Sequence, residues 1–494
     1  MPISILIALL IAFGLELPPA AYSASPAPWR ILGAAVGVLV VGILAFALGV
    51  WVAARVSGLG YASARIRRSY TRGLRFLTVF GLATYAWMIH HLGWSTLVLK
   101  DWGLEGSFLV DDLAVFAPFV LIQLLVWSGV YHAERAFQEP GRGLRLESFL
   151  WLKSRLALGL TLPVILIFFV RHDVLARLWP AWQDHPLVEP VELAVLGCLI
   201  LSASPAFVLM AWPTRSLPPG RLRRRLDVAA SRAGFRFTDV RVWDTNFTMV
   251  NACVTGVLPQ FRYVLLTDAM IECLSPEEIA AVFGHELGHV AHNHLPYFGF
   301  FFLGSLGVLS LVAQLCAVLA GWVKTLSLVP VEFASVVEEV VLSTAVLAFL
   351  GVYLWLVFGR LSRRFERQAD VYGCRTVSCG SLACPPHIEP EAVSAGAEAE
   401  GGVVGPPALC PTGIRIFSQA LATVALRNGI DTAAPSWRHG SIASRLAALE
   451  GLRLDPGSEA RFQRGVRNLR VILAGVLLIA LVVAVASQGW GSLP

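Results

Sequence analysis

Residues 275–294 read SPEEIAAVFGHELGHVAHNH, and the rest of the chain is organised around this stretch. Ser275 followed three residues later by Glu278 predicts a capped helix start, because each side chain bonds a free backbone N–H of the other. A helix turns once in about 3.6 residues, so His285 and His289 lie on the same face. The stretch therefore predicts one helix that presents two imidazoles side by side.

These two histidines belong to the pattern HExxH. Neutral imidazoles suit Zn²⁺, and a catalytic zinc site keeps one position open for water. Glu286 lies about 100° around the helix from His285, where it faces such a water without ligating the metal. Its carboxylate can take a proton as the water attacks a peptide carbonyl. The pattern predicts one catalytic Zn²⁺ with His285 and His289 as ligands and Glu286 as general base.

The segment 226–274, which precedes this helix, predicts a small antiparallel sheet. Segments rich in β-branched and aromatic residues alternate with turn residues and occupy 237–243, 249–254 and 261–267. In zinc peptidases an edge strand beside the metal pairs with the substrate backbone. Asn251 and Ala252 are our candidates for that edge, and an ordinary core strand is the alternative.

Two pairs of charged residues further along the chain are candidate site residues. Glu366 and Asp370 lie four residues apart on one face of a predicted helix, where a carboxylate can be a third zinc ligand and an aspartate can orient a histidine ligand. His439 and Arg445 lie six residues apart, and such residues near zinc can stabilise an oxyanion. Spacing alone leaves both assignments open.

The composition is that of an integral membrane protein, because 56% of the 494 residues are hydrophobic and only 15% are charged. Apolar runs near the length of about 20 residues that crosses a bilayer occupy 31–53, 76–97, 113–131, 155–171, 191–212, 297–323, 340–359 and 470–487. A further run, 3–17, lacks the basic start of a signal peptide, so we interpret it as a span and keep the signal peptide as the alternative. The sequence predicts a mainly helical protein with about nine spans.

Basic loops predict the orientation, because cytoplasmic loops carry most of the Lys and Arg residues. The loops 54–75, 132–154 and 213–225 are rich in arginine. Nine spans place all three loops and the helix 275–294 on the cytosolic side, most simply of the cell membrane. The 39 basic and 33 acidic residues give a net charge of +6, and the basic residues gather beside apolar runs, which indicates membrane orientation rather than a nucleic-acid footprint.

The segment 374–413 is rich in Pro, Gly, Ala, Ser and Glu and predicts a flexible insertion. Candidate ligands for a second, structural zinc in this insertion are Cys374, Cys379, Cys384, His387 and Cys410. Their spacing lacks the usual CxxC pairs, so the flexible insertion is the favoured interpretation. A disulfide framework is not expected on a cytosolic face.

Together these motifs resemble the membrane zinc metallopeptidases that include HtpX and the type I CAAX prenyl proteases, a gluzincin family. In that family an NAxxxG strand precedes HExxH, as residues 251–256 do here, and ExxxD follows after membrane helices. The resemblance implies that Glu366 is the third zinc ligand and that Asp370 supports the ligands from behind. His294 matches a further histidine that is common in the prenyl proteases.

A late HPxxxxR element of the same family corresponds to His439 and Arg445, which implies that they contact the substrate and the transition state. Here Gly440 replaces the usual proline, so the direction of the His439 side chain stays open. The predicted regions are a membrane region with about six spans at 1–213, the first half of a cytosolic α+β peptidase domain at 214–295, two spans at 296–360, the second half at 361–469, and a last span and tail at 470–494.

We therefore expect a zinc endopeptidase whose partners are the lipid bilayer and membrane protein or peptide substrates, in quality control or in the processing of prenylated tails. The alternatives are a transporter or channel, and an inactive scaffold with a structural zinc. Polar residues near span ends, such as His90 and Glu338, speak against a transport route, and the presence of Glu286 speaks against the scaffold. No nucleic-acid partner is expected, and the sequence leaves the oligomeric state open.

Overall fold

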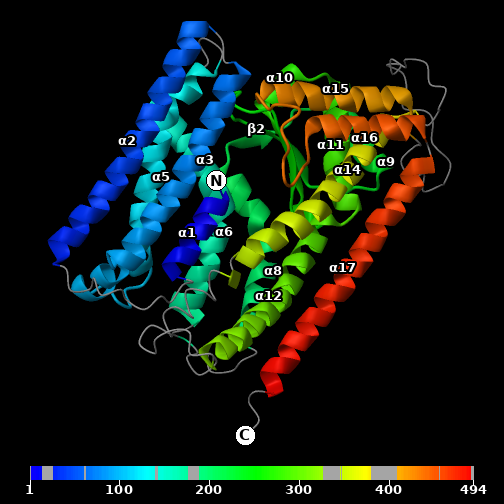
Figure 1. Ribbon diagram of the computed structural model, residues 1–494. Coiled ribbons are helices and arrows are strands. Elements are labelled where there is room, and N and C mark those ends of the chain that lie inside the picture. Colours follow the sequence, from blue (N-terminus) through cyan, green and yellow to red (C-terminus); the bar gives the residue numbers. More distant parts are fainter. Residues whose placement is uncertain are drawn as a thin grey trace. The chain divides into compact units, whose positions relative to one another are not determined.

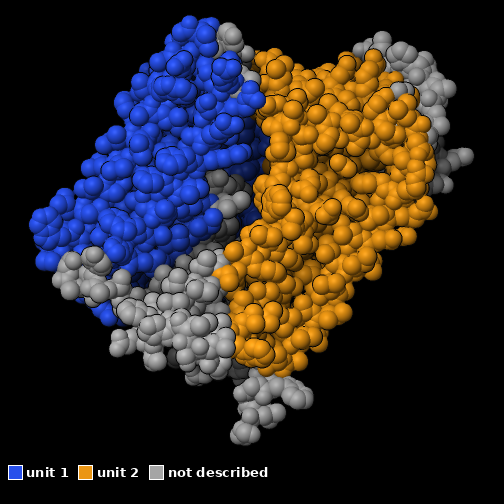
Figure 2. All heavy atoms as spheres, viewed as in Figure 1, with its two compact units in different colours: residues 1–217, 237–251, 255–269 blue, residues 218–236, 252–254, 270–494 orange. Residues whose placement is uncertain are grey.

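The computed structural model describes residues 2–13, 26–60, 63–138, 143–175, 178, 188–325, 345–346, 348–379, 409–455 and 457–490. These residues are mainly helical (Figure 1) and divide into two units (Figure 2), each of which is described by itself. Unit 1 comprises 1–217, 237–251 and 255–269, and unit 2 comprises 218–236, 252–254 and 270–494.

Unit 1 contains long apolar helices and three short strands. Its main helices are α1 (Pro2–Phe13), α2 (Ala27–Leu59), α3 (Ala64–Ala86), α5 (Val110–Ala136), α6 (Leu146–Phe169) and α8 (Val188–Ala211). The helices α2 and α5 pack closely because neither carries a side chain at the point of contact. A Cβ atom on Gly49 would lie 2.0 Å from the carbonyl oxygen of Gly129.

The sheet of unit 1 differs from the predicted antiparallel one. Strand β1 (Thr214–Ser216) pairs antiparallel with β2 (Asp239–Trp243), but β2 pairs parallel with β4 (Tyr263–Thr267). The connection 244–262 is long enough for the crossover that parallel strands need, and turn residues within it do not distinguish a hairpin from a crossover. The purely antiparallel prediction was therefore wrong, and β1 was missed.

Unit 2 holds the helix that was predicted from the opening motif, α11 (Pro276–Ala291). Its other elements are α9 (Arg221–Arg232), residues 252–254 of β3 (Ala252–Thr255), α12 (His294–Thr325), η7 (Leu354–Phe358), α14 (Gly359–Thr376), α15 (Pro411–Arg427), α16 (Ile442–Leu454) and α17 (Gly457–Trp490). The short helix α10 (Asp268–Cys273) precedes α11. In Figure 1, α14, α15 and α16 gather around α11.

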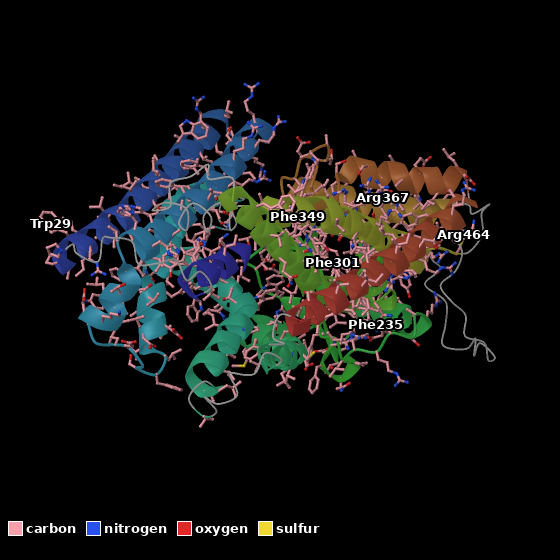
Figure 3. The ribbon with its side chains drawn as sticks, turned by 60° about the horizontal axis from the view of Figure 1, so that its bottom comes forward. Trp29, Phe235, Phe301, Phe349, Arg367 and Arg464 are labelled. Carbon is pink, nitrogen blue, oxygen red and sulfur yellow. The ribbon has the colours of Figure 1, made fainter. Side chains whose placement is uncertain are left out.

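Aromatic packing fixes α14 against the two apolar helices of unit 2. Phe301 of α12, labelled in Figure 3, is fully buried and forms one core cluster with Phe358 at the end of η7 and with Leu361 and Phe365 of α14. Val466 and Leu477 of α17 complete the cluster. This core therefore packs the first half of α14, and its member Phe365 directly precedes Glu366.

Within the described residues, four helices are long and apolar enough to cross a membrane: α2, α5, residues 294–319 of α12 and residues 457–487 of α17. Trp29 at the start of α2 is 67% exposed (Figure 3), as is typical of aromatic residues at a membrane interface. These helices support an integral membrane protein. The prediction of about nine spans stays a prediction, because part of the run 340–359 lies outside the described residues.

Candidate metal centre

The start of α11 forms the predicted capping box. The Ser275 N–H donates to Oε2 of Glu278 at 2.8 Å, and the Glu278 N–H donates to Oγ of Ser275 at 3.2 Å. Arg225 of α9 adds an ion pair to Oε1 of Glu277 at 2.7 Å. Negative side chains in the first turn also complement the helix dipole, so the local sequence and its neighbour fix where α11 begins.

Glycines let α11 and α14 approach each other closely. A Cβ atom on Gly288 would lie 2.9 Å from Cα of Ala369 and 2.9 Å from Cβ of Tyr372. On α14, a Cβ atom on Gly373 would lie 2.8 Å from the carbonyl oxygen of Ala281. Cβ atoms do not approach other atoms this closely. Gly288 on α11 and Gly373 on α14 therefore allow the carboxylates of α14 to reach the histidines of α11.

Three candidate ligand atoms converge between these helices, and they come from His285, His289 and Glu366. The two Nε2 atoms lie 3.2 Å apart, Oε2 of Glu366 lies 3.7 Å from Nε2 of His285, and its Oε1 lies 3.8 Å from Nε2 of His289. Donors about 2.0–2.1 Å from a tetrahedral zinc ion are about 3.4 Å apart. The donor set and its spacing therefore fit Zn²⁺ with little adjustment.

His285 is supported by a buried ion pair. Its Nδ1 atom lies 3.0 Å from Oδ1 of Asp370, a contact that we class as electrostatic because the ring N–H is not aligned for a regular hydrogen bond. Arg445 of α16 donates from both Nε and Nη2 to the two carboxylate oxygens of Asp370, with the Nε contact at 2.9 Å. The structure thus brings together Asp370 and Arg445, which the spacing had left unassigned.

His439 also reaches the centre. Its Nδ1 atom lies 2.9 Å from Oε1 of Glu366, although its side chain is 48% exposed. Gly440 has a φ of 75°, a left-handed conformation that proline cannot adopt. The tight turn from Ser436, whose carbonyl accepts the Gly440 N–H at 2.9 Å, directs His439 toward Glu366. Burial alone would raise the pKa of Glu366, but the hydrogen bond from His439 and nearby positive charges hold it below its usual range.

Glu286 sits beside the two histidines in a different environment. Burial raises its pKa to about 7, a shift that the charge of Glu366 increases and that of His285 reduces. The backbone N–H of Val254 in β3 hydrogen-bonds to its carboxylate, a contact that the sequence did not predict. A carboxyl group whose pKa lies near neutrality is able both to accept and to return a proton.

The two residues of the candidate edge strand, Asn251 and Ala252, belong to different units. Asn251 belongs to unit 1, where its N–H donates to Oγ1 of Thr267 and its carbonyl accepts the Thr267 N–H, both at 3.0 Å. Ala252 begins β3 and belongs to unit 2, two residues before Val254. A substrate-binding role for Asn251 and Ala252 stays a prediction.

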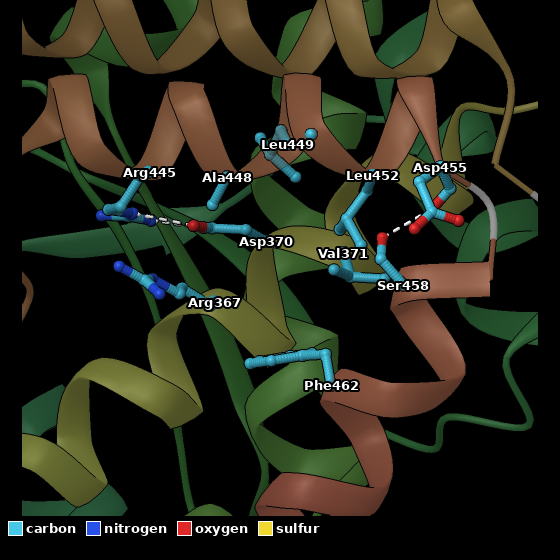
Figure 4. A pocket seen from close by; sticks show the side chains of 11 residues that line it. Arg367, Asp370, Val371, Arg445, Ala448, Leu449, Leu452, Asp455, Ser458 and Phe462 are labelled. Carbon is cyan, nitrogen blue, oxygen red and sulfur yellow. Dashed lines mark hydrogen bonds and ion pairs between the residues drawn. The ribbon is translucent and has the colours of Figure 1, made fainter.

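Beside the Asp370–Arg445 pair lies a cavity of about 310 Å³, walled by α14, α16 and the start of α17 (Figure 4). Val371, Leu449, Leu452 and Phe462 make most of its surface apolar. Asp370 and Arg445 themselves form part of the cavity wall, so the ion pair borders a mainly apolar cavity on this side. Cys384 and His387 lie outside the described residues, and the described cysteines are not gathered into a metal-binding group.

Comparisons with known proteins find a family model and several relatives that resemble the region around this site. Residues 216–385 match the model of peptidase family M48. The HtpX protease homolog of Methanocaldococcus jannaschii is 29% identical over 114 residues, which cover 22% of this chain and 39% of that protein. CAAX prenyl protease 1 of Saccharomyces cerevisiae is 31% identical over 108 residues, which cover 21% of this chain and 24% of that protein.

Residues 216–385 of this chain are similar to the peptidase family M48 domain. The predicted resemblance to HtpX and the CAAX prenyl proteases is confirmed by these matches. The crystal structure of S. mikatae Ste24p aligns with a TM-score of 0.49 and 16% identity over 86% of this chain and 99% of that chain. The M48 match includes His285, Glu286 and Glu366 but ends before His439 and Arg445, whose place at the site is seen only in the geometry.

Proposed function

We propose that this protein is a membrane-embedded, zinc-dependent endopeptidase that cleaves membrane-associated proteins. The observation that carries the proposal is the convergence of ligand atoms from His285, His289 and Glu366, all within 4.8 Å of one another. A purely structural site needs no base, yet Glu286 lies on the next position of the helix with a pKa of about 7.

His285, His289 and Glu366 would hold Zn²⁺, which when bound would supply a Lewis acid able to lower the pKa of water and to polarise a peptide carbonyl. Glu286 takes the proton of the attacking water and later returns it to the leaving amine. The Val254 N–H orients the carboxylate for both transfers. Burial matters here because a carboxyl with an ordinary pKa would be a poorer proton donor in the second transfer.

The remaining charged residues have supporting roles in this proposal. Asp370, clamped by Arg445, holds His285 in position. His439 hydrogen-bonds Glu366 from a side that is open to solvent, where it can also donate to the oxyanion of a tetrahedral intermediate. Nη1 of Arg445 lies 3.7 Å from Oε2 of Glu366, so the positive charge of Arg445 also acts on this third ligand. The geometry supports a positioning role for Arg445 and direct contact by His439.

For the substrate we propose an extended peptide that pairs with the strand around Asn251 and Ala252. Extended peptides commonly bind proteins in this way, by adding a strand to an exposed sheet edge. The two halves of the peptidase domain, 214–295 and 361–469, are proposed to face the cytosol at the cell membrane. Substrates are then membrane-bound proteins whose cytosolic segments reach this surface. The relatives named above, an HtpX protease homolog and a CAAX prenyl protease, are consistent with either quality control or tail processing.

Purified full-length protein in detergent tests the proposal through zinc content and proteolysis of an unfolded membrane protein. We expect about one zinc per chain in the wild type. Glu286→Gln should keep the zinc and lose proteolysis by a factor of about 10³ or more, because the proton acceptor is removed. An active Glu286→Gln protein, or a wild type without zinc, would contradict the proposal.

A further inference from the structure

A line of side chains behind His289 has no part in the mechanism above. Nδ1 of His289 lies 2.9 Å from Nδ1 of His294, and Nε2 of His294 lies 3.0 Å from Oε1 of Gln368. The amide nitrogen of Gln368 in turn donates to Oε1 of Gln463. The line therefore runs from α11 through the first residue of α12 and the middle of α14 to α17.

The hydrogen-bonding roles in this line are fixed by its first member. His289 directs Nε2 toward His285 and Glu366, so a metal ligand at that position needs its lone pair there and its proton on Nδ1. That proton meets Nδ1 of His294, which must then accept. We assign the proton of His294 to Nε2, where it faces the carbonyl oxygen of Gln368.

The last bond completes the assignment. With its oxygen turned to His294, Gln368 presents its NH₂ group to Gln463, whose oxygen accepts. Each of these three hydrogen bonds pairs a donor with an acceptor, and no charged group takes part. A neutral imidazole whose second nitrogen is held by a hydrogen bond is the arrangement that fixes the tautomer of a metal-ligating histidine.

The fold holds His294 firmly in this position. The side chain is 1% exposed and stacks on Phe365 with ring centroids 4.1 Å apart and planes 7° apart. Asn293 before it adopts a φ of 53°, a left-handed turn that asparagine tolerates and that separates α11 from α12. Gln368 is 6% exposed, so both side chains are ordered by their surroundings before any metal binds.

We infer that His294 and Gln368 are positioning residues that hold His289 in the tautomer able to bind the metal, with Gln463 as the anchor on α17. The inference rests on the proposed zinc site. It adds that a helix long and apolar enough to cross the membrane contributes, through Gln463, to the affinity of that site. Outer partners of metal-ligating histidines typically change metal affinity by about 10–100-fold when removed.

The test measures zinc affinity of the full-length protein in detergent by competition with a fluorescent chelator. His294→Phe keeps an aromatic ring against Phe365 and removes both nitrogens, so affinity should fall by about 10–100-fold. His132→Phe in α5 is the matched control and should leave affinity unchanged. The absorption spectrum of the Co²⁺-substituted protein should change in His294→Phe, because His289 is no longer held in one orientation.

Two substitutions of Gln368 separate positioning from packing. Gln368→Glu keeps an oxygen that accepts from His294, so zinc affinity should stay within about threefold of the wild type, whereas Gln368→Leu should lose about tenfold. A packing role predicts the reverse order, since leucine is apolar and glutamate buries a charge. Thermal unfolding of each metal-free variant checks that it is folded.

The failures of the two proposals differ. Wild-type zinc affinity and an unchanged Co²⁺ spectrum in His294→Phe, or a larger loss in Gln368→Glu than in Gln368→Leu, overturn the positioning role and leave the peptidase proposal intact. A wild-type protein that binds no zinc overturns both.

Discussion

The two histidines of α11 are supported in opposite ways. Behind His285 stands a charged pair, Asp370 and Arg445, and the negative charge of Asp370 raises the pKa of this histidine although burial acts in the other direction. Behind His289 stands the neutral line that begins with His294. Burial, together with the charge of nearby His285, lowers the pKa of His289 to about 4.

This difference teaches that one metal centre can combine two kinds of support. A charged residue interacts strongly with the histidine that it supports. If either member of its buried ion pair is lost, however, the other member remains as a buried, unpaired charge. A neutral hydrogen-bonded line costs less when it is broken, and it can reach further because no member needs a counter-ion. We therefore expect substitutions on the His285 side to have larger effects than substitutions on the His289 side.

The largest effect is expected from Asp370→Asn. Asp370 is 1% exposed, and losing its charge leaves the buried Arg445 guanidinium with only the more distant carboxylate of Glu366, 3.7 Å away, as a counter-ion. We expect a cost of up to about 3–5 kcal/mol in free energy of unfolding. His285 also loses the negative charge beside its Nδ1 atom, so zinc should be lost. Zinc content and thermal unfolding of the purified protein measure both consequences.

Asp455→Asn is the matched control for that substitution. Asp455 pairs with Arg461, but both side chains are more than half exposed, and such pairs contribute little. We expect unchanged zinc content and an unchanged melting temperature. If Asp370→Asn behaved like this control, the charged support of His285 would be dispensable and the comparison between the two sides would fail.

An intermediate effect is expected from Gly288→Ala, which changes both sides together. The new methyl group would lie 2.9 Å from Cα of Ala369, so α11 and α14 must separate at a cost of about 1–3 kcal/mol in free energy of unfolding. Zinc affinity should fall as the histidines move away from Glu366. Titration of zinc against a chelator measures the change.

Gly451→Ala in α16 serves as its control, because a Cβ atom there would meet nothing within 4 Å. Alanine in an open helical position should stabilise the protein by about 0.5–1 kcal/mol and leave zinc affinity unchanged. Equal zinc affinity in Gly288→Ala and the wild type would show that the close approach of the two helices is not needed for the site.

Local rules predicted the parts of this molecule that depend on neighbouring residues. Ser275 and Glu278 predicted the start of α11, and the spacing of the two histidines predicted that they lie on one face of it. The partners that meet across long separations did not follow from periodicity. Arg445 bonds Asp370 across 75 residues and Gln463 bonds Gln368 across 95, and only the packing of α16 and α17 on α14 brings them together.

The parallel pairing of β2 and β4 escaped prediction for a related reason. Turn residues between two strands are equally compatible with a hairpin and with a crossover, so pairing direction depends on which strands become neighbours. The family resemblance supplied Glu366 as a third ligand, where the ExxxD pattern alone is common on solvated helices. The geometry adds the donor spacing that makes this assignment testable.

The smallest effect is expected from Gln463→Leu, at the far end of the neutral line. Gln463 touches neither histidine, and its loss leaves Gln368 with one unpaired N–H while His294 still donates to the Gln368 oxygen. A single neutral hydrogen bond contributes about 0.5–1.5 kcal/mol, which sets an upper limit of about tenfold on the change in zinc affinity.

Competition with a chelator resolves a change of this size, and Gln314→Leu in α12, whose amide bonds only Ser310 of the same helix among the contacts described, is the matched control. We expect a loss of about twofold to tenfold for Gln463→Leu and none for Gln314→Leu. Because α17 crosses from the metal centre into a candidate membrane span, a loss as large as that of Asp370→Asn would mean that this helix, and not the charged pair, is the main support of the site.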